Sequence, residues 1–189
     1  MVLEGTEREL VAACQRGDRD AFRAVFELHK DRVYSIALRF TGDPAAAMDI
    51  AQDTFLKLFS CIRDFRGQSS LDTFLYRLVV NACLDRRRKD RRLLPLVEEW
   101  AATLLAKDAT PTENLLRNEV ADLVRSAIEK LAPDLRMVIV LRYTEGLAYD
   151  EIAAVLGCSP GTVASRLNRA HKLLERRLGH LAPEGGRLV

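Results

Sequence analysis

The sequence predicts an all-α protein with two small helical domains joined by an acidic linker, the C-terminal one being a helix-turn-helix domain. Apolar residues recur every three or four positions, which is the spacing of one helix face, and no strand-like alternation is visible. The chain has 189 residues, 48% hydrophobic and 30% charged, which suits one larger or two small globular domains. A stretch in which the helical periodicity degrades separates the two expected domains.

The first domain is expected to span residues 1–92 and to contain helices over residues 7–16, 20–40, 44–62 and 71–89. Gly17 and Asp18 interrupt the pattern between the first two helices. Asp43 is placed as the N-cap of the third helix, because Pro44 after it suits the first helical position. Residues 65–70 are rich in Gly and Ser and form a loop before the fourth helix.

A linker is predicted over residues 93–110, where helical periodicity degrades, and the second domain over residues 111–189. Thr110, Pro111 and Glu113 have the spacing of a capping box that starts this domain. Its helices are predicted over residues 111–131, 133–143, 149–156 and 160–177.

Positive charge is concentrated in two segments, although the net charge of the chain is only +2. Residues 85–92 carry six basic side chains and two acids, and residues 159–179 carry five basic side chains and one acid. Residues 93–119 between them are acidic. Two basic patches separated by an acidic connector favour two contacts with one polyanion.

The segment from residue 149 to residue 178 predicts a helix-turn-helix. Gly157 stands where the first helix ends, and Ser159 and Pro160 suit the cap and first position of the second helix. Val163 and Leu167 begin its apolar inner face, and the outer face is basic, as major-groove binding requires. A solvated helical hairpin is the plainer alternative. The candidate duplex-binding residues are Thr162, Ser165, Arg166, Asn168, Arg169 and Lys172.

A second candidate surface combines the 65–70 loop with the helix that follows it. Aromatic rings provide stacking surfaces for unpaired bases, and a basic helix provides cations for the backbone of a single strand. For Phe65, Phe74 and Tyr76, plain core packing remains open at this point. The candidate strand-binding residues are Phe65, Ser69, Ser70, Thr73, Phe74, Tyr76, Arg77, Asn81 and Arg88.

A polar stripe on the third predicted helix is formed by Asp49, Gln52, Asp53 and Lys57. These residues lie at i, i+3, i+4 and i+8, opposite an apolar face that includes Ile50, Phe55, Leu58 and Phe59. The stripe is either a solvated helix face or a docking face for a partner protein. A metal pair at Asp49 and Asp53 is not expected, since no third ligand accompanies them.

These motifs together resemble the extracytoplasmic-function (ECF) sigma factors of bacterial RNA polymerase. The resemblance is carried by residues 49–59, 65–67 and 73–77 with Asn81, and in the second domain by residues 135–178. It implies that the 49–59 helix docks on core RNA polymerase, that residues 65–88 recognise a melted −10 strand, and that the 160–177 helix reads the −35 duplex. Phe74 stands where the family usually has tryptophan, and Ala164 where a basic residue is frequent.

The expected partners are therefore core RNA polymerase, promoter DNA as duplex and as melted strand, and an anti-sigma factor. No cofactor, metal or catalytic residue is predicted, because the four cysteines and three histidines are scattered. The N-terminus lacks a signal-peptide layout and no long apolar run occurs, so a cytoplasmic protein is expected. The alternatives are a stand-alone helix-turn-helix regulator and a sigma-like protein that docks on polymerase without reading DNA.

Overall fold

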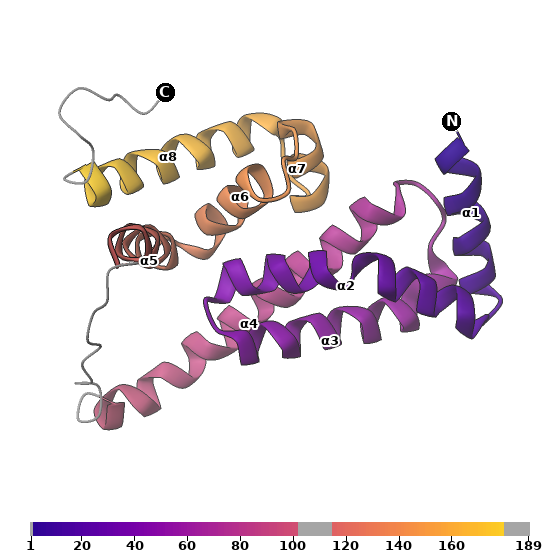
Figure 1. Cartoon of the computed structure of the whole chain (residues 1–189), viewed down its shortest axis with the longest axis horizontal. Helices are drawn as coiled ribbons and strands as arrows, with labels where there is room; N and C mark the ends of the chain where they lie inside the picture. Colours follow the sequence, from indigo (N-terminus) through magenta and orange to yellow (C-terminus); the bar gives the residue numbers. More distant parts are fainter. Residues whose placement is uncertain (1, 102–114, 180–189) are drawn as a thin grey trace.

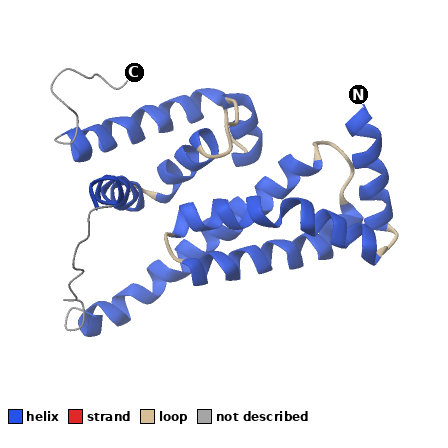
Figure 2. Ribbon diagram, viewed as in Figure 1, coloured by secondary structure: helices blue, strands red, loops and turns tan. Residues whose placement is uncertain are grey.

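The computed structural model describes the backbone of residues 2–101 and 115–179, and the side chains of residues 7–89 and 120–179. Every regular element in these ranges is helical (Figure 2), which confirms the predicted fold class. The capping box predicted at Thr110 to Glu113 lies outside the described residues.

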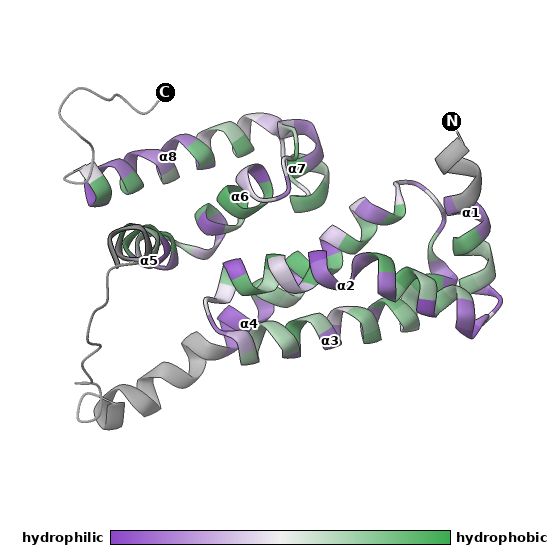
Figure 3. Cartoon of the chain, in the orientation of Figure 1, coloured by the Kyte–Doolittle hydropathy of each residue, from purple (hydrophilic) through white to green (hydrophobic). Residues whose placement is uncertain are grey.

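The N-terminal helices are α1 (Val2–Gln15), α2 (Arg19–Thr41), α3 (Pro44–Cys61), the 3-10 turn η1 (Ile62–Asp64) and α4 (Leu71–Ala101). The C-terminal helices are α5 (Leu115–Glu129), α6 (Pro133–Tyr143), α7 (Tyr149–Leu156) and α8 (Pro160–Leu178). Hydrophobic and hydrophilic residues alternate around these helices (Figure 3), as expected for helices that each bury one side.

Local sequence signals account for the ends of α2 and α3. The side chain of Asp18 accepts hydrogen bonds from the backbone N–H groups of Asp20 and Ala21, at 2.9 and 3.1 Å, and so caps α2. Gly42 ends α2 with a φ of 76°, a left-handed conformation that glycine adopts without strain. Asp43 then caps α3 through the N–H of Ala45, with Pro44 at the start, as predicted.

The N-terminal domain is a bundle in which α2 packs on α3 and α4, while α1 covers α2 and η1. Buried residues of α2 follow the three- and four-residue spacing of one helix face, with Ile36 and Ala37 fully enclosed. Leu58 of α3 and Val79 of α4 complete the centre and are also fully buried. This packing sets the relative positions of the loop before α4 and of the outer faces of α3 and α4.

The C-terminal domain is built around α6, whose residues from Leu135 to Leu141 are all buried. It packs against α7 and α8, and α5 packs on α8. Val163, Leu167 and Ala170 form the inner face of α8 and have at most 1% of their surface exposed. The predicted division of α8 into an apolar inner face and a basic outer face is therefore confirmed.

Two details differ from the sequence-based expectation. Helix α4 continues to Ala101, twelve residues beyond the predicted end at residue 89. Arg and Lys are good helix formers, so the basic run extends the helix rather than ending it. Phe59 was placed on the apolar face of α3, but its side chain is 59% exposed and lies beside the polar stripe, because residue 59 is one helical position past the buried Leu58.

The two domains lie against each other, with α6 and α7 facing α2 and α4 (Figure 1). Helix α8 lies on the side of the C-terminal domain that faces away from the N-terminal bundle (Figure 1). The buried hydrophobic residues of both domains form one continuous cluster.

The packing predicts a large difference between two leucines of α3. Replacing the fully buried Leu58 by Ala should lower the free energy of unfolding by about 2–5 kcal/mol, because the cavity is only partly refilled. The matched change Leu56→Ala removes a side chain that is 59% exposed and should alter stability by less than about 0.5 kcal/mol. Urea unfolding followed by circular dichroism measures both, and equal losses would contradict the assigned core.

Candidate nucleic-acid interface

The helix-turn-helix is formed by α7, a tight turn and α8. Gly157 ends α7 with a φ of 63°, which bulky residues adopt only with strain. Ser159 accepts a hydrogen bond from the N–H of Thr162 at 3.1 Å, and Pro160 begins α8, as predicted. The local signals thus fix the angle at which α8 leaves the turn.

The six predicted duplex-binding residues differ in their surroundings. Asn168, Arg169 and Lys172 are exposed on the outer face of α8, and the described part of the chain offers them no hydrogen bond or ion pair. Arg166 is partly buried and forms an ion pair with Asp134 at 3.2 Å. Thr162 and Ser165 use their hydroxyl groups within the first turns of α8. The side chains that project freely are therefore those in the middle of the helix.

The 65–70 loop is held at both ends by α1. The side-chain amide of Gln15 donates to the backbone oxygens of Phe65, at 2.7 Å, and Ile62, at 3.2 Å. Glu7 accepts a hydrogen bond from the N–H of Leu71, the first residue of α4. Ser70 caps α4 by accepting from the N–H of Thr73 at 3.1 Å. Both ends of the loop are thus fixed to the bundle surface.

A cavity of about 620 Å³ separates this loop from α1. Its walls include Phe65, Ser69 and Ser70 from the loop and Arg8 and Gln15 from α1. Phe65 also contacts Phe74, with ring centroids 4.8 Å apart. Two of the three candidate stacking residues therefore form one aromatic pair at the junction of the loop and α4.

The predicted strand-binding residues of α4 divide into exposed and covered ones. Asn81 and Arg88 are exposed. Arg77 is also exposed, but its Nε donates to the backbone oxygen of Ala154 in α7 at 3.0 Å. Tyr76 is 8% exposed, and its hydroxyl lies 3.1 Å from a carboxylate oxygen of Glu145. Two of the predicted residues thus contact the C-terminal domain.

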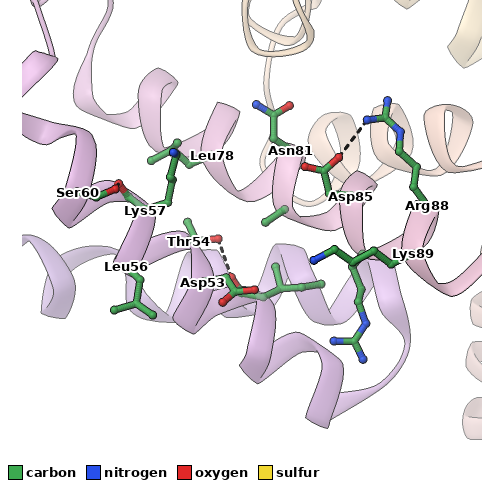
Figure 4. A pocket seen from close by; sticks show the side chains of 13 residues that line it. Asp53, Thr54, Leu56, Lys57, Ser60, Leu78, Asn81, Asp85, Arg88 and Lys89 are labelled. Atoms are coloured by element: carbon green, nitrogen blue, oxygen red, sulfur yellow. Dashed lines mark hydrogen bonds and ion pairs between the residues drawn. The ribbon is translucent and has the colours of Figure 1, made fainter.

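A groove of about 940 Å³ runs between α3 and α4. Asp53 and Lys57 line it from α3, and Asn81 and Arg88 from α4; Figure 4 shows these side chains and the ion pair of Arg88 with Asp85. The structure therefore brings together residues from the predicted polymerase-docking stripe and the predicted strand-binding surface. Asp49 and Gln52 are also exposed, Asp49 lying 3.3 Å from Arg86.

An apolar face of α3 adjoins the polar stripe. Met48, Leu56 and Phe59 are each 59 or 60% exposed, and together with Phe22 and Phe26 of α2 they line a hollow of about 950 Å³. This patch was not predicted as part of a site. The only sequence signal for it was the number of large apolar residues in α3, which exceeds what one helix face can bury.

A cluster of charged groups at the start of α4 was also not predicted. Asp72 pairs with Arg32 at 3.2 Å and lies 3.4 Å from Nδ1 of the buried His29. Burial lowers the pKa of His29, although the nearby Asp72 carboxylate acts in the opposite direction. Burial and the neighbouring Glu145 carboxylate raise the pKa of Tyr76. This cluster connects α2 and α4 with the turn between α6 and α7.

Within the described ranges, no three His, Cys, Asp or Glu side chains converge as a metal site would require. None of the helices searched there has the length and apolar character needed to span a membrane. A helix-turn-helix with a basic outer helix on one domain, and an aromatic and basic surface on the other, are the features of a nucleic-acid-binding protein.

Comparison with known proteins identifies the family within that class. Residues 25–93 match the family model for Sigma-70 region 2, and residues 121–174 match that for Sigma-70, region 4. RNA polymerase sigma-H factor of Pseudomonas aeruginosa is 33% identical, over 97% of this chain and 100% of its own. The ECF RNA polymerase sigma-E factor of Escherichia coli is 34% identical, over 92% of this chain and 94% of its own. The chain belongs to the ECF sigma factors, which direct RNA polymerase to promoters.

Solved structures agree with this fold. CnrH, solved in complex with the cytosolic domain of CnrY, is similar with a TM-score of 0.69 and 27% identity, over 93% of this chain and 99% of CnrH. RpoE of Bartonella quintana, solved with the anti-sigma factor NepR, has a TM-score of 0.61 at 23% identity, over 84% of this chain and 96% of RpoE. The family resemblance expected from the sequence is confirmed, and the alternative of a stand-alone regulator is not favoured.

The buried histidine predicts a pH dependence of stability. Because the pKa of His29 is lowered in the folded chain, the unfolded chain binds this proton at higher pH. Stability should therefore fall as the pH drops below about 6.5, by up to about 1.4 kcal/mol per pH unit. Among the charged groups near the ring, Asp72 and Glu7 raise the pKa of His29 and Arg32 lowers it.

Urea unfolding at pH 7.5 and pH 5.5 tests this expectation. His29→Gln should reduce the loss of stability between the two pH values, whereas His171→Gln, at an exposed position of α8, should leave it as in the wild-type chain. An unchanged loss in His29→Gln would show that other groups cause the dependence.

Proposed function

We propose that this sigma factor reads a promoter in two parts while α3 holds core RNA polymerase. In this scheme α8 reads the −35 element as duplex, and the 65–70 loop with α4 holds the −10 element as a melted strand. The observation that supports the proposal is that the basic outer face of α8 and the aromatic, basic surface of the 65–70 loop and α4 lie on different domains of one chain. In the expected division, residues 1–92 bind polymerase and the −10 strand, residues 93–110 form the linker, and residues 111–189 bind the −35 duplex.

The duplex contact rests on the outer face of α8. Arg169 and Asn168 are exposed near the middle of the helix, with Lys172 one turn further on. Arginine bonds guanine edges in a bidentate manner, and asparagine bonds adenine, while lysine contacts phosphates. Arg166 must exchange Asp134 for DNA before it can take part, so we assign it a secondary role.

The strand contact rests on the cavity beside the loop and on the aromatic pair next to it. Opening a promoter base requires a few kcal/mol of unstacking, and stacking on an aromatic ring returns roughly 1–3 kcal/mol. Phe65 and Phe74 supply the rings, and Ser69 and Ser70 supply hydroxyl groups at the cavity wall. The exposed Asn81 and Arg88 continue this surface along α4 toward the basic run.

Polymerase docking is assigned to the outer face of α3. Asp49, Gln52, Asp53 and Lys57 form the polar part, and the exposed Leu56 and Phe59 supply apolar contact area. Protein interfaces commonly combine an apolar centre with a polar rim. The mixed character of this face supports a protein partner better than a solvated helix.

The proposal extends to regulation and location. RpoE of Bartonella quintana was solved with the anti-sigma factor NepR, and an inhibitor of this class is proposed for the present chain. A protein that acts with RNA polymerase is expected in the cytoplasm, and we assign it no catalytic activity of its own.

Run-off transcription with purified core polymerase tests the whole scheme. Genomic fragments that co-purify with the holoenzyme are sequenced and then used as templates. Transcripts that start at defined positions only when the chain is added support the proposal. Association with polymerase without any promoter-specific transcript would instead favour a sigma-like protein that does not read DNA.

The duplex contact predicts a specific loss in Arg169→Ala. Loss of one bidentate base contact is expected to weaken promoter use by about 5- to 150-fold, equivalent to 1–3 kcal/mol. Arg125→Ala is the matched control, since Arg125 is an exposed arginine of α5 in the same domain. Run-off transcription from a recovered promoter measures both variants, and equal activities would contradict the assignment of Arg169.

The proposed docking face predicts that Lys57→Glu weakens binding to core polymerase even in the absence of DNA. Reversing this charge on α3 should weaken association with core polymerase about ten-fold, since interface charges contribute on this scale. Lys172→Glu makes the same change on α8 and should leave polymerase association unchanged in the absence of DNA. Titration of labelled chain with core polymerase measures both affinities, and wild-type binding by Lys57→Glu would exclude that residue from the interface.

A further inference from the structure

The two domains are joined by polar contacts that use residues of the proposed strand-binding surface. Glu145, in the turn between α6 and α7, has a side chain only 8% exposed. It accepts a hydrogen bond from the Tyr76 hydroxyl at 3.1 Å and lies 3.9 Å from Nε of Arg32. Next to it, Arg77 donates to the backbone oxygen of Ala154 at 3.0 Å. An acidic side chain and a backbone oxygen thus occupy groups proposed to face a nucleic acid.

A second contact lies at the end of α2. Arg136 of α6 is 4% exposed, and its Nη1 donates to the backbone oxygen of Phe40 at 2.6 Å. The same guanidinium also bonds the backbone oxygen of Ile128, at 3.2 Å, within its own domain. The side chain of Glu129 lies directly over Gly42, so closely that a Cβ at this position would overlap it. The C-terminal domain therefore contacts the end of α2 through Arg136 and Glu129.

The two nucleic-acid interfaces are affected differently by this closure. Tyr76 and Arg77 are engaged by α7 and the turn before it. Helix α8, which carries the exposed Arg169, lies on the side of the C-terminal domain that faces away from the N-terminal bundle (Figure 1). The closure therefore covers part of the strand-binding surface and leaves the duplex-binding helix accessible.

We propose that this closed arrangement is a self-inhibited state, in which Glu145 occupies the strand-binding face of α4 until the domains separate. The inhibitory effect rests on the proposed function of that face, whereas the closure rests only on the contacts described. A carboxylate is a suitable substitute ligand, because its anionic oxygens accept a hydrogen bond from the Tyr76 hydroxyl, as the oxygens of a phosphate would. The continuous hydrophobic cluster favours closure in the free chain.

The charge reversal Glu145→Arg tests the closure, because it places a second guanidinium beside Arg32. Asp150→Arg is the matched control: it makes the same charge change five residues away, at an exposed position for which the described residues provide no ion pair. Small-angle X-ray scattering should give a larger radius of gyration for Glu145→Arg and an unchanged one for Asp150→Arg.

Nitration of tyrosines, mapped by mass spectrometry, provides a second readout within each sample. Nitration proceeds through the phenolate, and each unit by which a pKa is raised lowers the phenolate fraction about ten-fold. In the wild-type chain Tyr76 should react at least about ten-fold more slowly than Tyr143, which is 64% exposed. Glu145→Arg should raise the rate at Tyr76, with the rate at Tyr143 as internal reference.

Binding of a short fluorescein-labelled single strand of mixed sequence tests the inhibition. If the wild-type chain is mostly closed, its apparent affinity is reduced by the fraction that is open, so Glu145→Arg should bind more tightly than Asp150→Arg, by about five-fold or more. Should Glu145→Arg lose its helical circular dichroism, the isosteric Glu145→Gln gives the same comparisons with a smaller effect.

The outcomes separate the two levels of the proposal. Scattering and nitration that do not change between Glu145→Arg and Asp150→Arg would overturn the closure, whatever the chain does in transcription. An opened Glu145→Arg chain whose strand affinity is unchanged would overturn the inhibition. If such a chain also failed to support promoter-specific transcription, the proposed function would fail independently of the closure.

Discussion

Helix α4 must satisfy three neighbours at once, and the rest of the molecule is arranged around this constraint. With 3.6 residues per turn, a helix can present a different set of side chains in each direction. Leu75, Val79 and Cys83 are buried in the core, while Asn81 lines the groove shared with α3. Tyr76 reaches the C-terminal domain. A shift of α4 along or about its axis would therefore disturb the core, the groove and the domain contact together.

The features that the sequence predicted correctly depend on residues close together in the chain. Asp43 with Pro44, and Ser159 with Pro160, define helix starts within three residues, and Gly157 marks a helix end by its own backbone freedom. The helix-turn-helix and the loop before α4 follow from such signals. Family resemblance added the expected roles, which no local pattern supplies, and the comparisons confirmed the family.

The features that escaped prediction depend on residues distant in sequence. Tyr76 and Glu145 are 69 positions apart, and Arg136 lies 96 positions from Phe40. No short stretch of sequence therefore contains both partners of either contact. The sequence does contain one signal for Arg136. A cation within the apolar run from Leu135 to Leu141 must find hydrogen-bond acceptors in the interior. That pattern indicates a buried hydrogen-bonded arginine but does not indicate its partners.

The continuous core sets the condition under which the domains can part. Separation would expose hydrophobic residues now shared between them and remove the acceptor of Arg136 at Phe40. A ligand shifts such an equilibrium only by as much as it prefers the open form. Polymerase docking on α3 would bury Leu56 and Phe59, which are exposed here. The binding free energy gained in this way is the same for the closed and the open chain, unless polymerase also contacts a surface that opening frees. The free energy of opening must therefore come from contacts made only in the open form. Such contacts are those of a partner with the freed face of α4, or with both domains held apart.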